Sequence, residues 1–150
     1  MAADLIVARI VHIASAAIWF GGTLFLAAVA VPYARTLEET ERSRLVTELG
    51  RRFRPVSWGA LIGLLASGIY TMHKFGLLSL GALRSSEYGK GLLVKLGFAG
   101  LILVLAAWHD FVLGPRYERT GQGRGALIAI GRTNGILTIV VLVLGVVLAH

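Results

Sequence analysis

The sequence lacks cysteine entirely and is poor in charge, proline and methionine. Its 150 residues include three prolines and two methionines, and Asp, Glu, Lys and Arg together make up only 15%. Without cysteine, disulfide bonds, zinc–thiolate sites and thiol chemistry are excluded. Average soluble domains are about a quarter charged, so a chain of this length that is 56% hydrophobic cannot hide its apolar surface in a water-soluble core. A soluble globular enzyme and a disordered chain are both excluded.

Four charge-poor stretches stand out, and each is close to or above the roughly 20 residues that a helix needs to cross a bilayer. They cover residues 5–31, 55–75, 91–113 and 125–149. No stretch alternates at period two, as a transmembrane barrel strand would. The sequence predicts an all-α integral membrane four-helix bundle, formed as a single domain by residues 1–150. The first stretch has no basic region before it, so we expect a retained helix rather than a signal peptide.

Basic residues outnumber acidic ones, 15 to 8, which in an apolar chain indicates contact with lipid headgroups rather than with nucleic acid. The loops after the first and third stretches carry Arg35, Arg42, Arg44, Arg51, Arg52, Arg54, Arg116, Arg119 and Arg124. The opposite side has Arg9, Lys74, Arg84 and Lys90. The positive-inside bias therefore predicts a multi-pass protein of a bacterial-type inner membrane, with both termini on the outer, periplasmic side.

The longest loop lies between Pro32 and Pro55. Within it Leu45, Leu49 and Phe53 recur at helical spacing among charged residues. This pattern fits a short helix on the lipid headgroups, and it fits a solvated helical linker equally well.

Ionisable groups inside membrane helices are costly and often functional. His12 lies about 10 Å inside the first span, from the helical rise per residue. His73 and Lys95 lie near the same predicted outer side, whereas His109 and Asp110 lie near the opposite end of the third span. The outer side of the membrane is therefore where His12, His73 and Lys95 are expected to lie.

Two histidines on facing helices could ligate a b-type haem, and His12 with His73 fits best. Trp19 and Gly22 share the His12 stripe, where small residues would let a macrocycle approach the backbone, and Tyr70 extends the facing seam. The same seam contains small residues at intervals of four: Gly59, Gly63 and Ser67. Lys95 would lie near the haem propionates.

A copper site is the rival hypothesis. Copper(I) prefers sulfur, and only Met1 and Met72 supply it, so a copper(I) route has few ligands. Met72 and His73 together could offer one soft and one imidazole ligand. Copper(II) would accept His12, His73 and His150.

The chain resembles the membrane domain of copper resistance protein D, and more distantly the four-helix membrane protoporphyrinogen oxidases of the HemJ type. Four segments carry the likeness: RIVHIASAAIWFGGTLF, RRFRPVSWGALIGLLASGIYTM, SEYGKGLLVKLGFAGLILVLAAWHD and IGRTNGILTIVVLVLGVVLA. The first family implies copper handling across the inner membrane. In the second, a His matched by His12 and a Lys matched by Lys95 are linked to haem binding, and Trp108-His109 only loosely matches its later Tyr-His.

The main hypothesis is a membrane protein that binds haem b and transfers electrons, as a small subunit beside other membrane or periplasmic redox subunits. The alternative is a copper resistance or copper transport protein of the first family. A HemJ-type protoporphyrinogen oxidase is the further alternative.

Overall fold

The computed structural model describes residues 3–148, with the side chain of Arg124 left out. These residues form helices and turns, with no strand among them. They divide into two compact units, residues 1–75 and 76–150, and each unit is a helical hairpin. We describe each hairpin by itself.

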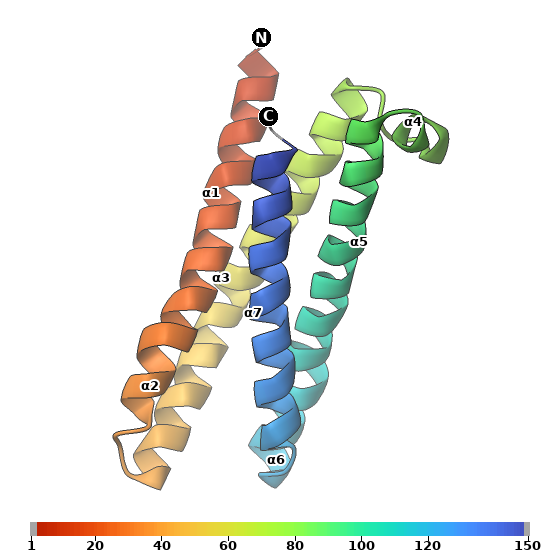
Figure 1. Ribbon diagram of the computed structural model, residues 1–150. Coiled ribbons are helices and arrows are strands. Elements are labelled where there is room, and N and C mark those ends of the chain that lie inside the picture. The colour runs from red at the N-terminus through yellow and green to blue at the C-terminus, as the bar shows by residue number, and fades with distance from the viewer. Residues whose placement is uncertain (1–2, 149–150) are drawn as a thin grey trace. The chain divides into compact units, whose positions relative to one another are not determined.

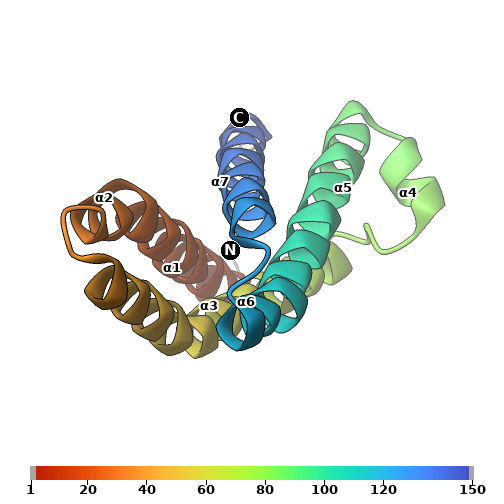
Figure 2. The same ribbon diagram turned by 90° about the horizontal axis from the view of Figure 1, so that it is seen from below.

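The first hairpin contains α1 (Ala3–Phe25), a π-helical turn (Leu26–Ala30), α2 (Val31–Ala34) and α3 (Glu39–Lys74). Figure 1 shows α1 and α3 side by side along most of their length. The second hairpin contains α4 (Leu80–Arg84), α5 (Glu87–Trp108), a π-helical turn (His109–Leu113), α6 (Gly114–Thr120) and α7 (Arg124–Val147). Here α5 packs on α7, and Figure 2 shows α4 beside α5.

Four of these helical stretches are long and apolar enough to cross a membrane: residues Ala3–Ala34, Glu39–Lys74, Glu87–Thr120 and Gly125–Val147. Large apolar side chains point outward, as Ile13 and Ile62 do with 61% and 63% of their surface exposed. Buried positions hold mostly small residues, which suits helices whose outer faces meet lipid and whose inner faces pack closely. The predicted all-α membrane fold with four spans is confirmed, while the orientation of the termini and the single-domain assembly stay predictions.

The segment before Pro55 differs from the predicted loop. Residues 39–54 are the first half of α3, and Pro55 lies inside this continuous helix. A proline in a helix interior removes one backbone hydrogen bond, a loss that membrane helices tolerate better than isolated ones. Leu49 and Phe53 accordingly line a groove against the end of α1.

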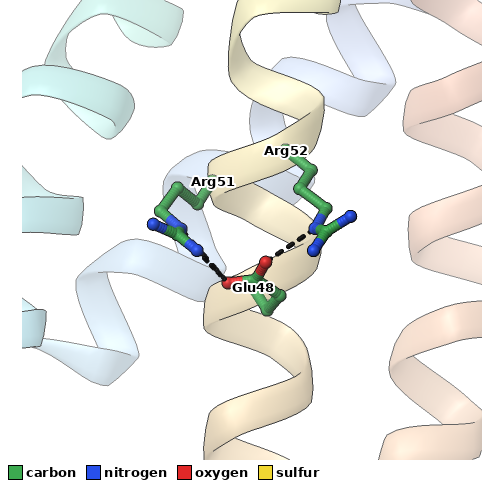
Figure 3. Close-up of polar contacts among 3 residues, drawn as sticks. All are labelled: Glu48, Arg51 and Arg52. Atoms are coloured by element: carbon green, nitrogen blue, oxygen red, sulfur yellow. Dashed lines mark hydrogen bonds and ion pairs between the residues drawn. The ribbon is translucent and has the colours of Figure 1, made fainter.

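The charged first half of α3 carries its own ion cluster. Glu48 accepts hydrogen bonds from Arg51 at 2.6 Å and from Arg52 at 2.6 Å, as Figure 3 shows. Both arginine side chains are largely exposed, 70% and 79%. One carboxylate between two guanidinium groups leaves net positive charge, which suits the headgroup level of a membrane.

Each hairpin widens its first long helix just before a proline. The Val31 N–H bonds the Leu26 carbonyl, five residues back, and Pro32 follows. The Gly114 N–H bonds the His109 carbonyl in the same way, and Pro115 follows. Because a proline ring collides with the carbonyl four residues before it, a π turn at that point gives the ring room and lets the helix continue. The spans therefore run beyond their predicted ends.

Serine caps and glycines fix the ends of the elements in the second hairpin. The side chain of Ser86 accepts a hydrogen bond from the Gly89 N–H at 3.0 Å and begins α5. Gly121 ends α6 with a φ of +66°, a conformation that glycine adopts without strain. The predicted loop around residues 114–125 thereby shortens to the turn between α6 and α7.

Candidate functional site

Small residues bring α1 and α3 into close contact. A Cβ atom at Gly63 would collide with the Oγ atom of Ser15, and one at Gly22 would collide with the ring of Phe53. Ser15 and Ser67 are both buried. The predicted inward stripe of α1 and the Gly63–Ser67 part of the α3 seam therefore do meet, whereas Gly59 faces open space.

His12 lies in this seam and pairs with a residue 55 positions away. Its Nδ1 atom is 2.9 Å from the Oγ atom of Ser67. The Ser67 hydroxyl has one proton, which it donates to the Gly63 carbonyl oxygen at 2.6 Å. With that proton on the Gly63 carbonyl, Ser67 accepts from the His12 tautomer that has its proton on Nδ1, and in this tautomer Nε2 carries the lone pair. A neutral imidazole held in one tautomer is the form that binds metal ions.

A second polar group lies at the open end of the same hairpin, where α1 begins and α3 ends. The Asp4 Oδ2 atom accepts a hydrogen bond from the Tyr70 hydroxyl at 2.7 Å and pairs with the Lys74 Nζ atom at 2.6 Å. The Lys74 ammonium also lies 5.4 Å from the centre of the Tyr70 ring. Tyr70 and Lys74 are four residues apart, so one face of α3 presents both to Asp4.

An open cavity of about 430 Å³ connects these two groups along the hairpin. Asp4 and Tyr70 line one part of it and Ser67 another, and the remaining wall is apolar: Val7, Ala8, Val11 and Ala66. The cavity therefore extends from Asp4 to Ser67, the hydrogen-bond partner of His12.

The remaining predicted site residues of this hairpin have other surroundings. Trp19 is buried on α1, and the Phe53 ring fills the space beside Gly22. His73 is exposed in the last turn of α3 and lies six residues beyond Ser67, an axial offset of about 9 Å. His12 and His73 therefore lie at different depths, and the glycine-lined slot expected for a macrocycle is occupied by protein side chains.

Lys95 belongs to the second hairpin. Its Nζ atom would be 3.2 Å from a Cβ atom at Gly145, so the ammonium lies against the backbone of α7. Ile102 and Ala106 share the Lys95 face of α5 by helical spacing and are buried, and Thr138 is buried on α7.

His109 and Asp110 form a pair within the π turn of the second hairpin. The Nδ1 atom of His109 is 2.8 Å from the Oδ1 atom of Asp110. No group of three or more His, Cys, Asp or Glu side chains among residues 3–148 could hold a metal ion together. His150, named as a copper(II) ligand, lies outside the described residues. The described chain therefore holds single donors and pairs rather than an assembled metal centre.

Comparison with known proteins decides the family. Residues 47–148 match the sequence model of copper resistance protein D. The chain belongs to this family. As a member of the copper resistance protein D family, it is a multi-pass membrane protein of the type found in bacterial inner membranes, in contact with the lipid bilayer.

Two relatives extend the match. The copper transport protein CutJ of Bacillus subtilis is 35% identical over 113 residues, which are 75% of this chain and 20% of CutJ. An uncharacterized protein of Aquifex aeolicus is 26% identical over 135 residues, which are 90% of this chain and 88% of that protein. This copper resistance protein D homologue thus spans about a fifth of the length of CutJ. No solved structure gives a significant match.

These matches favour the copper alternative over the main hypothesis drawn from the sequence. Neither match supports haem b, electron transfer or likeness to the HemJ-type oxidases. Residue type alone does not make this choice, because a histidine within a span suits haem iron and copper equally well. The packing at Gly22 and Gly63 favours the same alternative, since side chains lie close to both glycines.

Sequence reasoning missed Asp4 and the role of Ser67. Asp4 was not among the candidate site residues, and Ser67 was named only as a small residue in a seam. A usable signal was present, because Tyr70 and Lys74 share a helix face with Ser67 near the end of a span. A carboxylate at the start of the neighbouring antiparallel span is then the natural partner for that face.

Proposed function

We propose that this chain is a copper resistance or copper transport protein that passes copper ions along the α1–α3 hairpin, with His12 as the residue that contacts the ion. The observation that carries the proposal is the family match over residues 47–148, supported by the similarity to CutJ, which is named a copper transport protein. The cargo is copper itself.

The surroundings of His12 support this role. Imidazole nitrogen is a good ligand for copper, and the Ser67 hydroxyl orients the His12 ring through Nδ1. An ionisable side chain inside a membrane span marks an ion pathway more often than it marks packing alone. Ser67, the hydrogen-bond partner of His12, lines an open groove that Asp4 and Tyr70 also line.

A partner protein completes the proposed route. Since the chain corresponds to about a fifth of CutJ, we expect that another membrane or periplasmic protein delivers or receives the copper. Residues 3–148 contain single donors and pairs of donors but no group of three that could hold a metal ion. Such weak sites suit an ion that passes through the protein rather than one that stays bound.

Copper tolerance tests the proposal directly. A strain lacking the gene would be complemented with the wild-type chain, with His12→Ala, or with His109→Ala as the matched control, since His109 is also a histidine within a membrane helix. We expect His12→Ala to lose the effect of the chain on copper tolerance and on cell copper content, and His109→Ala to keep it. Equal tolerance for wild type and His12→Ala, at equal protein levels in the membrane, would refute the role of His12.

A further inference from the structure

The groove at the turn end of the first hairpin combines apolar walls with one cation. It lies between the end of α1 and the first half of α3 and has a volume of about 250 Å³. Among the described residues that line it, only Arg52 is charged. The others are Gly22 and apolar side chains, including Phe25, Leu49 and Val56. Such a surface matches a molecule that has both a hydrocarbon chain and an anionic group.

The length of α3 places this groove at the level of the lipid headgroups. Lys74 ends the helix and pairs with Asp4, and a lysine at the end of a span reaches the bilayer surface. Arg52 precedes Lys74 by 22 residues (74 − 52), which is about 33 Å from the helical rise per residue. The hydrocarbon layer is about 30 Å thick, so Arg52 lies at the opposite surface. Val56, about one turn deeper, lies within the hydrocarbon.

The charge beside the groove favours an anion. Residues 48–54 contain three arginines and one glutamate. Glu48 pairs with both Arg51 and Arg52 at 2.6 Å, so one carboxylate is shared between two guanidinium groups (Figure 3). Arg52 donates to Glu48 through its Nε–H group, and its side chain is 79% exposed, so the N–H groups at its tip can reach a ligand. These groups suit the paired oxygens of a phosphate.

We propose that this groove binds an anionic phospholipid, with the lipid phosphate on Arg52 and one acyl chain along Phe25 and Val56. Phosphatidylglycerol is the simplest lipid of this class, because its phosphate is the only charged group it has. Phosphatidylcholine offers the same phosphate but adds a quaternary ammonium group, which the neighbouring Arg51 repels. The site lies at the opposite end of the hairpin from Asp4 and does not depend on the proposed copper function.

The test is native mass spectrometry of the purified full chain, titrated with phosphatidylglycerol or with phosphatidylcholine of the same acyl chains. We expect phosphatidylglycerol to bind more tightly. Arg52→Gln should weaken its binding about fivefold, which corresponds to about 1 kcal/mol for one arginine near an anionic surface, and should leave phosphatidylcholine binding unchanged. Arg44→Gln is the matched control, because Arg44 is an exposed arginine of the same helix outside the groove, and it should change neither.

Two further substitutions separate the phosphate contact from the acyl-chain contact. Glu48→Gln removes the carboxylate that competes for Arg52, so it should tighten phosphatidylglycerol binding about two- to fivefold. Val56→Trp should fill the groove and weaken the binding of both lipids, and Val56 is exposed enough to accept the larger side chain. Ile62→Trp, at another exposed position of α3 outside the groove, should weaken neither.

Four outcomes overturn the proposal. Equal binding of the two lipids removes the selectivity, and equal losses in Arg52→Gln and Arg44→Gln assign it to the general charge of the helix. If Glu48→Gln and Arg52→Gln shift binding in the same direction, the ion cluster only stabilises α3. Glycerol phosphate has the anionic group without the acyl chains, so it should bind far more weakly than the lipid. If it binds as tightly, the site takes a free phosphate and the groove has no role.

Discussion

Replacing Gly63 by alanine should loosen the first hairpin, whereas replacing Gly59 by alanine should not. Both glycines lie inside α3, four residues apart, so each substitution gains the same roughly 1 kcal/mol of helix propensity. The new methyl group at residue 59 meets open space, but the one at residue 63 collides with the Oγ atom of Ser15. Overpacking of this kind costs about 1–3 kcal/mol. Because the propensity gain is common to both variants, the difference in their unfolding free energies should be about 1–3 kcal/mol, with Gly63→Ala the less stable.

A double-mutant cycle identifies the colliding atom. Without the Ser15 hydroxyl, the nearest remaining atom of that side chain, its Cβ, lies 3.4 Å from the new methyl group, which is ordinary contact. Ser15→Ala should therefore rescue Gly63→Ala and leave Gly59→Ala unaffected, with a coupling energy of about 1–2 kcal/mol. The assay is thermal or detergent-induced unfolding in micelles, with proteolysis of the hairpin turn as an independent readout. Equal stability of the Gly59 and Gly63 variants would refute the α1–α3 contact described here.

Two further predictions concern His12 and the second hairpin. Ser67→Ala removes the hydroxyl that pairs with His12 Nδ1, so it should weaken copper binding about tenfold. It should also change the tautomer of His12 that ¹⁵N NMR reports. Ser57→Ala, which alters another buried serine on the same helix, should change neither property. Gly89→Ala should displace α4 from α5, because the new Cβ would lie 2.8 Å from the carbonyl carbon of Leu83 and a backbone cannot rotate away. Gly97→Ala is the control, because a Cβ atom at residue 97 would have no neighbour within 4 Å. The rate of backbone hydrogen exchange at residues 80–84 should rise only in the Gly89 variant. An unchanged rate in that variant would contradict the packing of α4 on α5.

The spans and their inward faces were predictable because both follow from local pattern. Runs of apolar residues indicated the spans, and the spacing of small and polar residues indicated the His12 stripe of the first span and the Gly63–Ser67 seam of the second. The break expected at Pro55 was wrong, since proline lowers the stability of a helix without forcing its end in a membrane segment. Residue type alone also could not choose between haem and copper at His12, because imidazole serves both.

Pairings across long sequence separations were beyond the sequence. Asp4 and Tyr70 are 66 residues apart, and nothing in either neighbourhood specifies the other. Their contact depends on how far α1 slides along α3, and that register is set by the close approach at Gly63 and Gly22. Once the register is fixed, Asp4 arrives beside Tyr70 and Lys74, and His12 arrives beside Ser67. The candidate site is therefore a consequence of packing in the seam rather than of any motif.

Pro32 and Pro115 lie at the same distance in sequence from His12 and Lys95. Pro32 follows His12 by 20 residues (32 − 12), and Pro115 follows Lys95 by 20 residues (115 − 95). Each proline lies two residues beyond the end of a π turn, so the two hairpins have the same number of residues between the ionisable residue and the proline. In each hairpin that residue also meets a small residue of the second long helix, Ser67 for His12 and Gly145 for Lys95. The two hairpins therefore share the spacing between an ionisable residue and a proline, while the residue itself differs, an imidazole in one and an ammonium in the other.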